Sequence, residues 1–234
     1  MEIILNKKPK SPTIIEGFPG LGLIATISTE FLIKHLNAKS IGHIWSKELM
    51  PIAAVHENKI VQPLEIYFAE KENIVIVHAL SDVRGLEWDI SETLKKLYTM
   101  LKAKEMITIE GILSSSPTNG VFFYASNHSK KKKLESISLT PLKEGIIMGV
   151  TAGLVLKPKS MNMTGIFVET QSKLPDSKSA AKVVEVLDNY LDLKVDSKPL
   201  LAAAEQFEQK LKALLDQTKK TKDHKKAREL DYLG

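Results

Sequence analysis

The sequence contains no cysteine among its 234 residues. This absence excludes disulfides, thiolate metal sites and cysteine nucleophiles. Long apolar runs are missing too, since none approaches the roughly 20 residues of a membrane-spanning helix. The apolar stretch from Ile3 to Leu5 is too short for the core of a signal peptide. We therefore expect a cytoplasmic protein that makes no membrane contact.

Familiar catalytic and metal-binding motifs are also absent. The sequence has no G-x-S-x-G, H-E-x-x-H or Walker pattern, and its six histidines lack metal-ligand spacing. A Ser-His-Asp arrangement can be drawn from Ser115, His78 and Asp82, because Asp82 and Ser115 follow predicted strands. A core histidine and a loop ion pair between Asp82 and Arg84 explain the same residues more simply. We expect no enzymatic activity, no cofactor and no metal.

The positive charge is concentrated near the end of the chain. The formal net charge is +5, and residues 219–228 carry six basic side chains against one acidic side chain. Without that segment the balance is near zero, so the charge gives weak grounds for a nucleic-acid partner. The run from Lys130 to Lys133 is more simply a solvated face.

Hydrophobic periodicity predicts an α/β protein. Residues 73–80 and 105–113 are near-continuous apolar runs, typical of strands buried on both faces, and an amphipathic helix over about 88–104 separates them. Such alternation predicts a three-layer α/β/α fold with a largely parallel mixed sheet. Shorter patterns predict a hairpin over residues 50–61 and a strand over 137–139. We expect a core domain over 1–196, a C-terminal helix over 197–218 that packs on the core or a neighbouring subunit, and a flexible tail over 219–234.

One stretch near the N-terminus has a specified backbone path. Residues 13–25 read as a short strand, a turn containing Gly17, Phe18, Pro19, Gly20 and Gly22, and the start of a helix. Glycine permits positive φ and close backbone approach, while proline fixes φ. A tight strand-to-helix turn whose glycines allow close packing is the interpretation we favour.

The same turn leaves a second interpretation open. Residues 20–25 match the dinucleotide fingerprint G-x-G-x-x-A, which would hold phosphate on N–H groups at a helix N-terminus. Against it, the acid expected at the end of the second strand comes late, at Glu48, and Phe18-Pro19 makes the turn bulky. In this alternative, the protein is an α/β enzyme that uses the turn at residues 17–22 and the loop at 114–116 to bind a nucleotide or another phosphorylated ligand.

Two motifs resemble landmarks of the proteasome assembly chaperone family, in its archaeal branch. The first is the turn from Gly17 to Gly22 after an N-terminal strand. The second is the stretch over residues 170–181, in which Pro175-Asp176 opens an alanine-containing helix. Their order and spacing fit that family, and the resemblance covers most of the chain up to about Leu215.

The resemblance implies a non-enzymatic chaperone or adaptor that forms a homo-oligomer in an archaeal cytoplasm. Its implied partner is the proteasome core particle or its subunits, bound by C-terminal tails in pockets between α subunits. Tails of this family end in a hydrophobic-Tyr-any pattern, whereas Tyr232 is third from the end here. Apolar residues reappear after a charged stretch, which favours a docking peptide made of Leu230, Asp231, Tyr232, Leu233 and Gly234.

Overall fold

The computed structural model describes residues 1–56, 58–80, 82–113, 120–156, 161–170, 174–199 and 201–202. The chain divides into two compact units, Met1–Asp196 and Ser197–Gly234. In the second unit residues 198–199 and 201–202 are helical, and the packing of the helix predicted over 197–218 stays a prediction.

In chain order the first unit contains β1 (Glu2–Leu5), β2 (Thr13–Gly17), the 3₁₀ turn η1 (Leu21–Leu23), α1 (Ile24–His35), β3 (Lys39–Trp45), β4 (Ala54–His56), β5 (Lys59–Val61), β6 (Leu64–Ala69), β7 (Ile74–Ala79), α2 (Glu87–Leu101), β8 (Glu105–Leu113), β9 (Val121–Ala125), α3 (His128–Ser136), β10 (Thr140–Pro141), α4 (Gly149–Val155), β11 (Met163–Thr170) and α5 (Ser177–Leu191).

The main sheet has nine strands in the order β1-β3-β6-β7-β2-β8-β11-β9-β10. Its centre, β7-β2-β8-β11, is parallel. On one side β1, β3, β6 and β7 pair antiparallel, and on the other side β9 runs antiparallel to β11. The predicted mixed sheet is therefore confirmed, with its main parallel part in the four central strands.

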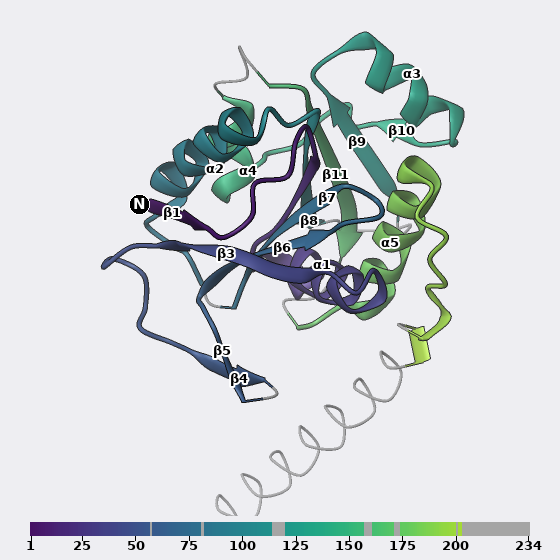
Figure 1. Ribbon diagram of the computed structural model, residues 1–234. Coiled ribbons are helices and arrows are strands. Elements are labelled where there is room, and N and C mark those ends of the chain that lie inside the picture. Colours follow the sequence, from purple (N-terminus) through teal and green to yellow (C-terminus); the bar gives the residue numbers. More distant parts are fainter. Residues whose placement is uncertain are drawn as a thin grey trace, which may run out of the picture. The chain divides into compact units, whose positions relative to one another are not determined.

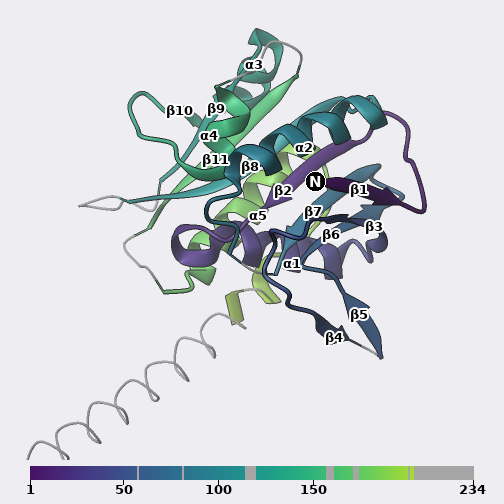
Figure 2. The same ribbon diagram turned by 90° about the vertical axis from the view of Figure 1, so that its left-hand side faces the viewer.

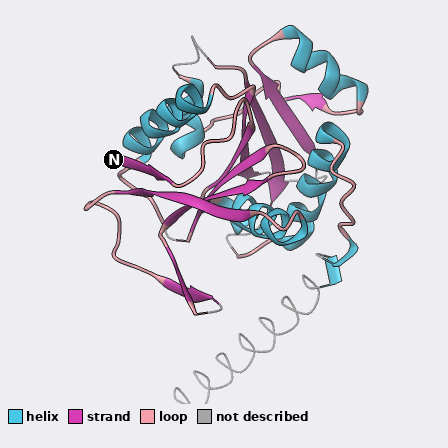
Figure 3. Cartoon of the chain, viewed as in Figure 1, coloured by secondary structure: helices cyan, strands magenta, loops and turns pink. Residues whose placement is uncertain are grey.

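Helices cover both faces of this sheet. Figures 1 and 3 show α2 and α4 on one side of the central strands and α1 and α5 on the other. The contacts agree, because α2 packs on α4 and α1 packs on α5. This arrangement confirms the predicted three-layer α/β/α fold.

The buried patterns explain these layers. All six residues of β7 are buried, as expected for a strand covered on both faces. In α5, Ala180, Val183, Val184 and Leu187 recur at helical spacing and are buried. Such a stripe turns one side of the helix toward the sheet and leaves polar residues outside.

The strand predicted over residues 137–139 is wrong. Ile137 is the C-cap of α3, and the backbone N–H groups of Ser138 and Leu139 donate to Glu135 and Leu134 of that helix. Ser138 has a φ of 65°, in the left-handed region, which a strand residue does not adopt. The residues that join the sheet are Thr140 and Pro141, in β10.

Candidate functional site

The turn after β2 is held by close packing against α1. Gly17 ends β2, and a Cβ atom at this position would lie 2.2 Å from Oγ1 of Thr29 on α1. Gly22 is buried, with a φ of +64°, and a Cβ there would lie 3.2 Å from Cβ of Asp176. Gly17 is therefore required because a side chain has no space there. Gly22 is required for space and also for its positive φ. The packing interpretation of the turn accounts for these two glycines.

The second motif lies directly against the first. The backbone N–H of Asp176 donates to the carbonyl oxygen of Gly22 (2.8 Å). The Asp176 carboxylate accepts from the backbone N–H of Ser179 (3.0 Å), and so caps α5. It also accepts from the hydroxyls of Thr170 and Ser179, each at 2.8 Å. The two motifs, far apart in sequence, form one structural unit.

A crevice opens beside this unit at the carboxyl ends of β2 and β8. It has a cavity volume of about 760 Å³ and is lined by the turn after β2, the loop after β7, the end of β8 and the segment leading into α4. Ligands of open α/β sheets bind at such edges. Phe18, Pro19, Ile112 and Met148 are among its apolar lining residues.

Two carboxyl groups, those of Glu16 and Glu110, line the crevice. Glu16 is 1% exposed, and its Oε1 accepts from the hydroxyl of Thr151 on α4 (3.2 Å). Burial, and then the charge of Glu110, raise the pKa of Glu16 well above its usual range. Burial raises the pKa of Glu110 to about 7. The crevice therefore holds protons near neutral pH.

Sequence reasoning missed this carboxyl pair. The signal was present, because each glutamate interrupts an apolar strand: Glu16 follows Ile14-Ile15, and Glu110 follows Ile109. The spacing alone could not show that both side chains point to the same face. The register does so, since Glu16 pairs with Thr108, two residues before Glu110.

The acids disfavour phosphate at the glycine-rich turn. Oε1 of Glu110 lies 3.6 Å from the position that a Cβ of Gly20 would occupy, and Asp176 lies against Gly22. The Asp176 carboxylate repels a phosphate group electrostatically, and Glu110 adds to this repulsion in its ionised form. The match to the dinucleotide fingerprint is better explained by packing.

His78 and Asp82, the two residues of the hypothetical triad that the structure describes, each have other partners. His78 is 3% exposed, its Nδ1 bonds Oγ1 of Thr29 (3.0 Å), and its Nε2 lies 3.5 Å from Glu30. It is thus the satisfied core histidine that the sequence predicts. Asp82 forms the predicted loop ion pair with Arg84. The loop over 114–116 lies outside the described residues.

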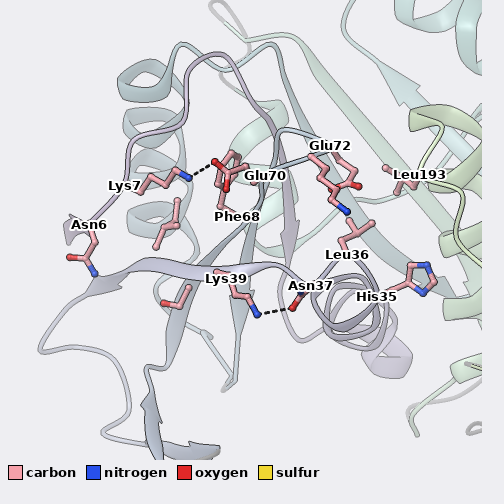
Figure 4. Close-up of a pocket in the computed structure, with 13 residues that line it drawn as sticks. Asn6, Lys7, His35, Leu36, Asn37, Lys39, Phe68, Glu70, Glu72 and Leu193 are labelled. Carbon is pink, nitrogen blue, oxygen red and sulfur yellow. Dashed lines mark hydrogen bonds and ion pairs between the residues drawn. The ribbon is translucent and has the colours of Figure 1, made fainter.

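A second hollow, of about 640 Å³, lies beside β3 and the start of the chain (Figure 4). Figure 4 shows Lys7 bonded to Glu70 and Lys39 bonded to Asn37, each at 2.7 Å. The ammonium groups of both lysines are thus bonded to other residues that line the hollow. It contains no residue that the sequence predicts to be functional.

Three further predictions concern the C-terminal tail, metal binding and membrane contact. The tail residues Leu230, Asp231, Tyr232, Leu233 and Gly234 lie outside the described part of the chain. Among the described residues, no group of three or more histidine or acidic side chains is placed to hold a metal ion. Within the same residues, no helix combines the length and the apolar character needed to cross a membrane.

Comparison with known proteins gives one consistent result. A sequence model of the PAC2 family matches residues 14–215. The crystal structure of Pyrococcus furiosus PbaA, described as an archaeal homolog of proteasome-assembly chaperone, is 28% identical with a TM-score of 0.82, covering 97% of this chain and 96% of that one. The uncharacterized protein MJ0106 of Methanocaldococcus jannaschii is 27% identical over 214 residues, 89% of this chain and 87% of the relative.

A further structure shows the same fold at lower identity. Pyrococcus furiosus PbaB, described as an archaeal proteasome activator, is 23% identical with a TM-score of 0.76, covering 91% of this chain and 98% of that chain. The motifs around Gly17–Gly22 and Pro175-Asp176 predicted the same relationship from the sequence. On these matches, the chain belongs to the PAC2 family.

Proposed function

We propose that this protein is a proteasome assembly chaperone, or an adaptor of the proteasome core particle, that acts by binding and not by catalysis. The similarity to PbaA, over 97% of this chain, carries the proposal. The contact between the two motifs supports the absence of catalysis, because the turn and the Asp176 loop hydrogen-bond to each other and pack together. The protein acts in an archaeal cytoplasm as a homo-oligomer.

The docking element is the C-terminal segment from Leu230 to Gly234. Its sequence places Leu230, Tyr232 and Leu233 after a strongly basic stretch. Each tail binds the core particle weakly, and an oligomer presents several tails at once. Multivalency then raises the overall affinity by about 10² to 10⁴ without any new contact.

The test is co-purification with an archaeal core particle. Full-length protein is compared with a chain that ends at Glu229, and a full-length variant with Asp223→Asn, in the basic stretch before the docking segment, serves as the control. We expect binding by full-length protein and the control, and loss of binding by the truncated chain. The oligomer is checked by light scattering, and equal binding by the truncated chain would refute tail docking.

A further inference from the structure

Residues 143–148, which we call the strap, lead from β10 into α4 and are anchored at their two ends. The backbone N–H of Leu142 donates to the carbonyl oxygen of Phe123 (2.8 Å), and the carbonyl oxygen of Met148 accepts from the N–H of Ala152 (3.3 Å). Between these anchors, the strap forms no backbone hydrogen bond with the residues that the structure describes. Figures 1 and 2 show α4, into which the strap leads, alongside α2.

Two glycines give the strap backbone freedom. Gly149 directly follows it with a φ of +69°, and a Cβ there would meet no atom of the described residues within 4 Å. Gly145 lies within the strap, and a Cβ there would first meet the flexible side chain of Leu142, at 3.2 Å. A few such positions can absorb the backbone rotations by which a loop opens and closes. The strap therefore has the features of a hinged segment.

The strap holds two large apolar side chains in water beside the crevice at the carboxyl ends of β2 and β8. Ile146 and Met148 are 86% and 63% exposed, and both line the crevice. Phe18, Pro19 and Ile112 give the crevice apolar walls, and its volume of about 760 Å³ leaves room for an isoleucine side chain. The hydrophobic effect therefore favours a closed arrangement, in which Ile146 leaves the water and enters the crevice.

The Glu110 carboxyl group opposes this closure when it is ionised. It lines the crevice that the strap would cover, and closure would remove the water around it. A carboxylate that loses its water without gaining a base is costly to bury, whereas the neutral acid is far less so. Burial already raises the pKa of Glu110 to about 7, so this group changes its charge near neutral pH.

The groups around Glu110 supply no base that could compensate its charge. The acids on the surrounding elements are Glu16 on β2, Asp82 and Glu87 between β7 and the first turn of α2, Glu144 on the strap, Glu169 on β11 and Asp176 beyond the glycine-rich turn. Among the described residues that line the crevice, the single base is Arg84, and it pairs with Asp82. The Thr151 hydroxyl from α4 bonds Glu16. Ionisation of Glu110 therefore adds a negative charge with no base beside it.

We propose that the strap closes over the crevice while Glu110 carries its proton and opens when Glu110 is ionised. Closure buries Ile146 and Met148, and opening returns them to water. A rise in pH through neutrality therefore exposes an apolar surface at this edge of the sheet, and a fall in pH hides it. The inference concerns the crevice alone and is independent of the tail and of the proteasome partner.

Oxidation of Met148 by hydrogen peroxide tests the strap in the natural chain. Peptide mass spectrometry gives the oxidation rate of Met148 and, in the same sample, that of Met100, which is 45% exposed on α2. The ratio of the two rates corrects for any effect of pH on the reagent. We expect the ratio of Met148 to Met100 to be lower at about pH 5.5 than at about pH 8.5, by roughly tenfold for a strap that is nine-tenths closed in acid.

Two variants separate the strap from a general effect of pH. Glu110→Gln has no charge to gain, so its ratio should stay low at both pH values. Glu144→Gln removes a charge from the strap itself and leaves Glu110 in place, so its ratio should change with pH as in the wild type. Circular dichroism checks that every sample is folded. A wild-type ratio that does not fall in acid overturns the inference, and so does a Glu110→Gln ratio that changes with pH as much as the wild-type ratio does.

Discussion

Glu110→Gln should make the stability of the protein less dependent on pH. Burial raises the pKa of Glu110 from 4.5 to about 7, so the folded protein binds this proton more tightly than the unfolded chain does. A group of this kind costs stability as pH rises, because the folded state must give up a proton that the unfolded chain has already lost. The loss begins near pH 4.5 and continues to just above pH 7.

The size of the effect follows from the same values. Each tenfold change in proton affinity corresponds to about 1.4 kcal/mol, and the change from 4.5 to about 7 therefore costs about 3 kcal/mol when Glu110 is fully ionised. Glutamine has nearly the same shape and no charge, so Glu110→Gln removes this cost. The variant should match the wild type near pH 4.5 and be more stable above pH 7, by up to about 3 kcal/mol.

Urea unfolding at fixed protein concentration measures the difference at intervals between about pH 4.5 and 8. Glu144→Gln removes one charge from the exposed rim of the same crevice, and so controls for the change in net charge. A difference between Glu110→Gln and the wild type that stays constant over this range would refute the reasoning, because it would show that Glu110 does not change its proton affinity on folding.

Two further predictions concern the joined motifs. Gly17→Ala should cost roughly 1 to 3 kcal/mol by overpacking, since the added methyl group overlaps the Thr29 side chain; urea unfolding measures the loss, and Thr29→Ser in the same chain should recover only part of it. Asp176→Ala should lower the thermal midpoint and cost about 2 kcal/mol, through loss of the α5 cap and of the bonds to its neighbours. Asp176→Asn keeps a capping oxygen and should cost less, so equal losses would contradict the capping role.

The layers of the fold could be predicted because each element carries its own pattern. The apolar run of β7 and the stripe of α5 are visible in the sequence. The antiparallel flanks could not be predicted, because strand order depends on pairings between distant segments such as β9 and β11. The strand expected over 137–139 was wrong because the apolar Ile137 and Leu139 close α3, a role that alternation does not reveal.

The site was predicted only in part, for a similar reason. The motifs around Gly17 and Asp176 were visible as unusual local sequences, but their contact through Gly22 is long-range. The carboxyl pair was missed because Glu16 and Glu110 lie on different strands, and only the parallel register of β2 and β8 places them on one face. The tail residues Leu230 to Gly234 lie outside the described residues, so their docking role stays a prediction.

The contact between the two motifs bears on what they can mean for function. Gly17 meets Thr29, Gly22 meets Asp176, and Asp176 bonds Gly22, Thr170 and Ser179. Residues engaged in this way stabilise the edge of the sheet and have little capacity left for a ligand. Substitutions in either motif should therefore change the free energy of unfolding first, and partner binding only as a consequence. By contrast, substitution of Tyr232 should change partner binding and leave the fold intact, because Tyr232 lies beyond the core domain expected to end at residue 196.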